Sequence, residues 1–217
     1  MSLSETDAAA PAAAQVKPRP QAAPGPLDGD PALIGVPTFV VGSIALGLSL
    51  VGYLPAEAAG APIAIILAAT ALGQFIAAVW AAALGQSAVA AVFGVFTGFW
   101  LSYAVLVLGL IHGWFGITAA AATRTQGAFL ISWLVTIVLL TVSTLRLPAA
   151  FTVLFTLIDV ALALVLWATL DGSGGVRTLG GYAVFAFVAV GFYLFVHVTS
   201  LATGGRGLPL GRPAVGG

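Results

Sequence analysis

Residues 33–54 read LIGVPTFVVGSIALGLSLVGYL, a stretch without a single charged side chain. A helix that crosses the ~30 Å hydrocarbon core of a bilayer needs roughly 20 mostly apolar residues. Stretches of similar length and hydropathy follow at residues 63–84, 88–111, 127–145, 149–170 and 178–202. The sequence therefore predicts an all-α membrane protein, a bundle of six transmembrane helices joined by short connections.

Composition excludes the main alternative classes. The chain has 217 residues, of which 60% are hydrophobic and 6% are charged. An ordinary soluble domain is about 25% charged, so a soluble fold would have almost nothing polar to cover its surface. The formal net charge is zero, so we expect no nucleic-acid partner. The absence of cysteine excludes disulfides, thiolate chemistry and Cys-based metal sites.

Both ends of the chain differ from its middle. Residues 1–29 are rich in Ala and Pro with scattered charges, which predicts a disordered cytoplasmic tail. Residues 30–203 hold the six spans and form one membrane domain. Residues 204–217 are rich in Gly and Pro, and we expect them to form a flexible tail.

The distribution of Lys and Arg predicts the orientation. With a cytoplasmic N-terminus, five of these side chains face the cytoplasm and two face outward. The five are Lys17, Arg19, Arg146, Arg206 and Arg212, and the two are Arg124 and Arg177. The positive-inside rule therefore favours both termini in the cytoplasm of a multi-pass plasma-membrane protein.

Pro37 lies inside the first apolar stretch. Proline in a helix interior removes one hydrogen bond and kinks the axis. We expect either that the membrane helix begins after Pro37, or that residues 31–37 form a bent or broken entry segment. Irregular backbone at membrane depth survives only inside protein or beside a water-filled cavity. Residues 30–39 are therefore the first place to look for a functional site.

Few residues offer reactive chemistry. No Ser/His/Asp arrangement, phosphate-binding loop or HExxH motif is present, so we predict no enzyme, no cofactor and no metal site. Asp159 is the one carboxylate inside a span. It either couples protons to transport or is hydrogen-bonded to a neighbouring helix or subunit. Gln74 carries a carboxamide that either pairs with another helix or lines a pore.

Aromatic residues gather in the third span, where residues 93–100 read FGVFTGFW. Helical spacing places Phe93, Phe96 and Trp100 near one face. Such a face serves either for packing and interfacial anchoring, or as a hydrophobic constriction that gates a narrow pore.

Three segments resemble a known family. Residues 30–36, DPALIGV, resemble the entry signature NPAPLGL of the acetate/succinate uptake transporter family, and Phe39 falls where that family also has Phe. Residues 73–75, GQF, resemble its Ala/Gly-Gln-Ile/Phe segment. Residues 93–100 resemble its third-span segment FTSYGSFW. The matches occur in the family's order, within a six-span layout over residues 30–203.

The resemblance implies a function and a site. Family members are small six-helix channels or proton-linked carriers that assemble as homo-hexamers, each subunit with its own pathway. The resemblance implies passage of small monocarboxylates, acetate above all, and also of the dicarboxylate succinate, by an anion channel or a proton symporter. The implied narrowing consists of Phe39, Phe96 and Leu157. The implied substrate region consists of Asp30, Pro31, Ala32, Leu33, Gly35, Gln74 and Thr97.

This chain departs from the family pattern at several of these positions. Asp30 replaces Asn, Leu33 replaces the second Pro, and Phe96 replaces a Tyr whose hydroxyl could bond a carboxylate. No Lys or Arg lies inside a predicted span. The passage therefore cannot rely on a full positive charge, which predicts weak binding of the anion or transport of the neutral acid with its proton.

Two other functions are compatible with six apolar spans. A urea or short-amide channel has a neutral substrate, which explains the missing cations. A non-transporting scaffold or sensor subunit would have no continuous path through its bundle. In the transport interpretation, spans one, two, three and five enclose a narrow, uncharged passage.

Overall fold

Helices account for the regular structure of the described chain. The computed structural model describes residues 28–216, so most of the predicted N-terminal tail lies outside the described residues. Six helical segments are long and apolar enough to cross a membrane, which confirms the predicted all-α, six-span fold. They are α1 (Ala32–Leu50), a second span made of α2 (Ala61–Ile65), η2 (Ile66–Ala71) and α3 (Leu72–Ala83), α4 (Ser87–His112), α5 (Ala119–Thr144), α6 (Ala149–Asp171) and α7 (Gly174–Ala202).

The largest boundary error concerns α5, which begins at Ala119 and not at residue 127. The prediction followed hydropathy, which drops at Arg124 and Gln126. A helix does not need an apolar side chain at every position, and the run of alanines from residue 119 favours helix strongly. The fourth span therefore extends beyond its apolar segment.

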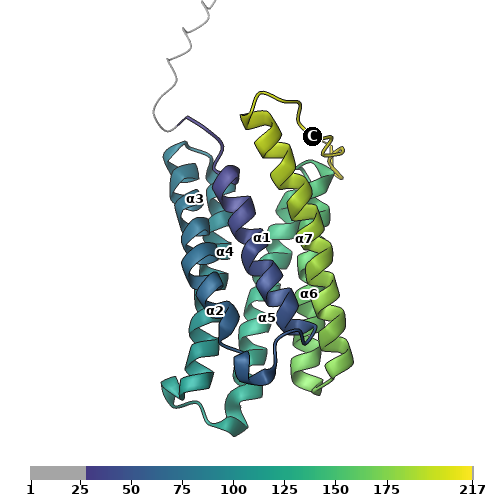
Figure 1. Cartoon of the computed structure of the whole chain (residues 1–217). Coiled ribbons are helices and arrows are strands. Elements are labelled where there is room, and N and C mark those ends of the chain that lie inside the picture. Colours follow the sequence, from purple (N-terminus) through teal and green to yellow (C-terminus); the bar gives the residue numbers. More distant parts are fainter. Residues whose placement is uncertain (1–27, 217) are drawn as a thin grey trace, which may run out of the picture.

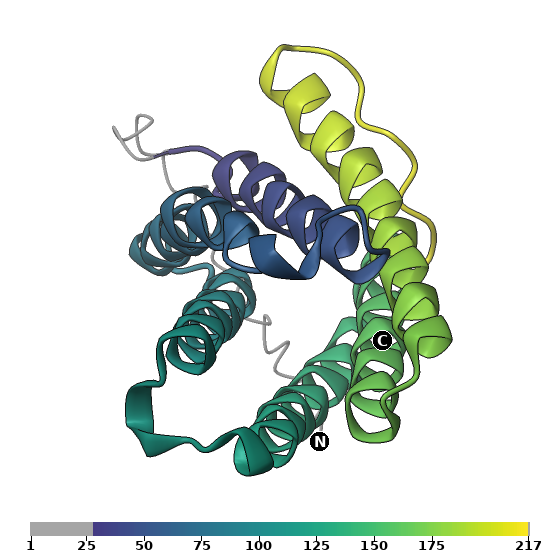
Figure 2. The same cartoon turned by 60° about the horizontal axis from the view of Figure 1, so that its bottom comes forward.

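The six spans form a ring around a common interior (Figures 1 and 2). Helix α1 packs between α3 and α7, α4 packs on α3, and α5 and α6 continue the ring back to α7. The ring closes where α4 meets α5, through aromatic side chains and a bond from the Trp133 Nε1–H to the Ser102 hydroxyl at 3.2 Å. We call the end of the bundle where α1 begins the proximal end, and the end where α1 finishes the distal end.

Glycines allow α1 to lie against the second span. A Cβ at Gly42 would clash with the Thr70 side chain, and a Cβ at Gly73 would clash with Thr38. Small residues let membrane helices approach this closely. The pairing fixes the register of α1 against η2 and α3.

The expected break at Pro37 does not occur. Helix α1 begins at Ala32, before the proline, and continues through it to Leu50. Proline removes only one hydrogen bond, and packed neighbours can hold the helix together across it. The irregular backbone lies instead in η2, a π-helical segment that packs against α1 and α4.

The chain after Gly204 lies against the bundle. The Ala150 N–H at the start of α6 donates to the Leu210 carbonyl at 2.9 Å, and the Tyr193 hydroxyl donates to the Pro209 carbonyl at 2.6 Å. The Val215 N–H donates to the Leu145 carbonyl at 3.0 Å. The prediction of a flexible tail missed these contacts, because a Gly- and Pro-rich sequence does not reveal which backbone groups it meets.

Candidate functional site: a central cavity and a distal vestibule

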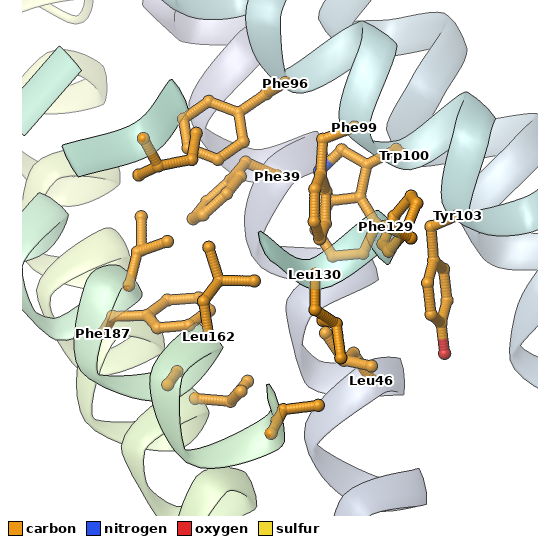
Figure 3. A pocket seen from close by; sticks show the side chains of 15 residues that line it. Phe39, Leu46, Phe96, Phe99, Trp100, Tyr103, Phe129, Leu130, Leu162 and Phe187 are labelled. Carbon is orange, nitrogen blue, oxygen red and sulfur yellow. The ribbon is translucent and has the colours of Figure 1, made fainter. Parts of the chain in front are cut away.

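A small cavity lies at the centre of the ring. Its volume is about 50 Å³, and Figure 3 shows the side chains that line it. They come from five of the six spans: Phe39, Leu46, Phe96, Phe99, Trp100, Tyr103, Phe129, Leu130, Ile137, Ile158, Ala161, Leu162, Val165, Val184 and Phe187. Apart from Trp100 and Tyr103, these side chains carry no polar atom.

Aromatic rings close the proximal side of this central cavity. Phe39 is the most proximal lining residue of α1, Phe96 that of α4 and Phe187 that of α7. The ring centroids of Phe39 and Phe96 are 5.0 Å apart, and those of Phe39 and Phe187 are 5.6 Å apart. Phe155 on α6 lies 5.8 Å from Phe96. Rings at these separations are in direct contact, so a solute can pass only when one of them moves.

A larger space, the distal vestibule, adjoins the cavity on its other side. Its volume is about 620 Å³. It shares the lining residues Leu46, Tyr103, Phe129, Leu130 and Val165 with the central cavity. Its other polar lining side chains are Ser49, Thr123, Gln126, Thr169, Ser173 and Arg177.

Arg177 is the one charged side chain among the described residues that line the vestibule. Its Nη2 donates to the Ser49 carbonyl at the end of α1, at 2.9 Å. An arginine has five N–H donors, so this bond leaves others for the vestibule. The vestibule therefore adds several polar groups and one fixed positive charge to a mainly apolar wall, and it adjoins a cavity whose wall is almost wholly apolar.

The structure brings together only part of the predicted narrowing. Phe39 and Phe96 line the central cavity, but Leu157 is half-buried and does not. Helix α6 contributes Ile158, Ala161 and Leu162 instead. The predicted set of enclosing spans also needs correction, because the second span contributes no lining residue, whereas α5 and α7 do.

Gln74 and Thr97 are buried away from both cavities. The Gln74 Nε2 donates to the Gly35 carbonyl and lies 3.4 Å from the Thr38 hydroxyl, so it links α3 to α1. The Thr97 hydroxyl donates to the Phe93 carbonyl of its own helix at 2.8 Å. Gln74 therefore joins two helices, Thr97 bonds only its own helix, and neither side chain lines one of the two cavities.

The entry segment caps α1. The Asp30 carboxylate accepts the Ala32 N–H at 2.9 Å, and the Asp30 carbonyl accepts the Leu33 N–H at 3.0 Å. The family resemblance implied that this segment belongs to the substrate region, where unpaired N–H groups at a helix start would suit an anion. The chain's own carboxylate occupies that position, so Asp30, Pro31, Ala32 and Leu33 form a helix start. Gly35 lies one turn further along, where a Cβ would clash with Phe93.

Asp159 lies between α5 and α6 and lines neither cavity. Its Oδ2 accepts the Thr141 hydroxyl at 2.7 Å. Its Oδ1 is buried without a hydrogen-bond partner among the described residues. The contact with Thr141 supports the structural interpretation of Asp159, a link between two helices.

The sequence contained a signal for the lining residues that we missed. Phe99, Trp100 and Tyr103 lie three, four and seven positions after the predicted Phe96, so they share its helical face. Of these, we had placed only Trp100 on that face. A spacing of seven also relates Leu46 to the predicted Phe39, and Val165 to Ile158. Periodicity alone does not separate a cavity wall from lipid-facing or core packing, because all three are apolar.

These features define a class: a multi-pass α-helical membrane protein whose single six-helix ring encloses two adjoining cavities. Residues 12–204 match the sequence profile of the GPR1/FUN34/yaaH family. The chain belongs to this family, which confirms its resemblance to the acetate/succinate uptake transporters.

One solved structure supports the same fold. It is described as "Structure of the bacterial acetate channel SatP" and matches with a TM-score of 0.73 at 23% sequence identity. The match covers 84% of this chain and 99% of that chain. No curated protein matches the chain. At 23% sequence identity, this match shows that the two proteins share the same arrangement of helices, and no more.

Proposed function

We propose that this protein transports small monocarboxylates, acetate above all, across the plasma membrane through a passage within each subunit of a homo-hexamer. The observation that carries the proposal is the junction of the two cavities: a wide vestibule with several polar side chains and one positive charge adjoins a small apolar cavity that Phe39 and Phe96 close. Family membership and the shared fold with a bacterial acetate channel support it.

The size of the central cavity fits the proposed substrate. A single buried water needs roughly 10–15 Å³ of such space, so about 50 Å³ accommodates a solute of a few heavy atoms. Acetate is of this size. Succinate is longer, and it would need the rings around the cavity to move further apart.

The apolar wall sets the cost of passage. A carboxylate that leaves water for an apolar site loses hydration that the wall cannot replace. The charge of Arg177 attracts the anion only as far as the vestibule. We therefore propose that the solute crosses the aromatic rings as the neutral acid, or as an anion that keeps part of its water. The first route is proton-coupled transport and the second is channel conduction.

Uptake of labelled acetate into proteoliposomes, with and without a pH gradient, tests the proposal. Protein-free vesicles are the control, because acetic acid crosses lipid by itself. We expect protein-dependent uptake, and acceleration by an inward proton gradient identifies the coupled route. Uptake of urea without acetate would establish the amide-channel alternative. If the protein changes the uptake rate of neither acetate nor urea, the scaffold alternative would be supported.

A further inference from the structure

Within the described part of the chain, Trp100 is the one side chain with a polar atom that lines the central cavity and not the vestibule. Tyr103, the other polar lining residue, also lines the vestibule. Trp100 is 1% exposed, and its Nε1–H has no hydrogen-bond partner among the described residues. A buried tryptophan N–H normally has a partner, and each exception requires an explanation.

The neighbours of Trp100 are aromatic rings. Its ring centroid lies 5.0 Å from that of Phe99, 6.3 Å from that of Phe39 and 6.4 Å from that of Tyr103. Figure 3 shows the indole nitrogen on the side of the ring towards Phe39 and Phe96. The phenylalanine rings carry no oxygen, and the Tyr103 hydroxyl does not accept the N–H group. The donor is therefore buried on the side of the proposed narrowing, without a partner among the described residues.

Trp133 provides the contrast. It lies on α5, outside the set of residues that line the central cavity, and its Nε1–H donates to the Ser102 hydroxyl. The two tryptophans lie in the same aromatic cluster, since both contact Phe99. They differ in one respect that matters here: one indole N–H is satisfied by the protein, whereas the other is buried beside the central cavity without a partner among the described residues.

An indole N–H can only donate. A ligand that satisfies it must present an acceptor oxygen on a body small enough for about 50 Å³. We infer that the Trp100 Nε1–H, covered while the neighbouring rings are in contact, binds a carboxyl oxygen of the transported acid at the central cavity when one of these rings moves, and so makes Trp100 a specificity-determining residue. This inference rests on the proposed function, because it assigns the binding group within that passage.

The competing explanation is local. The N–H could point at the face of the Phe39 ring, since the two rings meet at an interplanar angle of 67°, and N–H groups interact weakly with aromatic faces. In that case Trp100 contributes to packing and not to substrate recognition. The experiments must therefore separate recognition from stability.

The first experiment compares Trp100→Phe with Trp133→Phe in proteoliposomes. Loss of a hydrogen bond to a carboxyl group should raise the half-saturating acetate concentration about tenfold in Trp100→Phe. We expect Trp133→Phe to keep the half-saturating value of the unchanged protein, although it also loses a hydrogen bond. An equal half-saturating concentration in all three proteins would overturn the inference.

The second experiment does not depend on transport. The protein, ¹⁵N-labelled at its indole nitrogens, is titrated with acetate in detergent, and the Trp100 signal is assigned by its absence in Trp100→Phe. We expect a saturable downfield shift of the Trp100 N–H signal and a smaller or no shift for Trp133. An unmoved Trp100 signal would overturn the inference. If the Trp100 signal shifts saturably but the protein takes up no acetate, the proposed transport is rejected, whereas the assignment of Trp100 as the group that binds acetate is retained.

Discussion

The central cavity and the distal vestibule adjoin each other but differ in size and in the polar groups of their walls. The cavity has a volume of about 50 Å³ and is walled by aromatic and aliphatic side chains, whereas the vestibule has about 620 Å³, several hydroxyls and the Arg177 guanidinium. A charge in water-filled space attracts anions over several ångströms, whereas an apolar constriction discriminates by size and by the cost of losing water. The comparison indicates that attraction and discrimination take place at different sites.

Helix α6 lines both spaces, which permits a matched test of this division. Ala161 faces the central cavity and Ala168, two helical turns later on the same face, lines the vestibule. Phenylalanine at position 161 should fill the cavity and reduce acetate uptake to the rate of protein-free vesicles. The same substitution at position 168 should leave most of the flux, because the vestibule is more than ten times larger.

Both variants require a check of assembly by size-exclusion chromatography, because extra atoms in a packed region destabilise by about 1–3 kcal/mol. If Ala161→Phe assembles normally and still transports acetate, the central cavity is not the passage. If Ala168→Phe reduces acetate uptake as completely as Ala161→Phe does, then the central cavity is not the narrower of the two spaces for the solute.

The next prediction sharpens the role of the aromatic rings. Phe39 contacts both Phe96 and Phe187, so Phe39→Ala should open the proximal side of the cavity. Uptake of acids one or two methylenes longer than acetate should rise about tenfold relative to acetate uptake. Competition between labelled acetate and longer acids measures this ratio.

Two variants support the interpretation of that experiment. Phe75→Ala removes the same atoms from a residue that is 54% exposed on α3, and it should leave the ratio unchanged. Phe39→Leu keeps more of the core if Phe39→Ala does not assemble, since removing a buried phenylalanine costs about 3–5 kcal/mol. An unchanged preference in both Phe39 variants would remove these rings from the selectivity mechanism.

A smaller effect is expected from the charge in the vestibule. Arg177→Gln should raise the half-saturating acetate concentration about threefold to tenfold and weaken its dependence on ionic strength. Flux of acetamide, a neutral molecule of similar shape, should not change. Arg124→Gln, near the same end of the bundle but outside the vestibule lining, is the matched control.

Arg177 also bonds the Ser49 carbonyl, so a purely structural role is the alternative. That role predicts equal effects on acetate and acetamide. Arg177→Lys retains the charge and loses the planar fork of donors. It should therefore behave like the unchanged protein if attraction is the function of this residue.

The sequence was sufficient to predict the fold but not the walls of the passage. Apolar length identifies a membrane span independently of its neighbours, and all six were identified. Which face of a span turns inward depends on packing partners. Leu157 and Ile158 are adjacent and equally apolar, so only the placement of α6 decides that Ile158 lines the cavity.

Polar residues were the least predictable, because a sequence does not show which partner each will meet. Gln74 donates to the Gly35 carbonyl 39 positions away, whereas Asp30 accepts the Ala32 N–H only two positions along the chain. Both had been expected to contact substrate. Trp100, the donor that we now assign to the substrate, belongs to a segment that we interpreted either as packing or as an apolar constriction. Its unpaired N–H becomes apparent only when its neighbours are known.

The last prediction concerns a residue outside both spaces. Asp159 lines neither cavity and bonds Thr141 across the α5–α6 interface. If it is a structural link, Asp159→Asn preserves an acceptor for the Thr141 hydroxyl, shifts stability by no more than about 0.5 kcal/mol, and leaves the dependence of acetate uptake on pH as it was. A proton-coupling carboxyl predicts a different outcome, because an amide cannot take up and release a proton in this pH range. Acetate uptake in Asp159→Asn would then no longer be accelerated by the proton gradient.

Initial rates of acetate uptake at several external pH values separate the two roles. Thr141→Val is the control variant, because it removes the hydrogen bond but keeps the carboxyl group. Loss of the pH dependence in Asp159→Asn but not in Thr141→Val would place proton transfer at the α5–α6 interface and outside the aromatic passage.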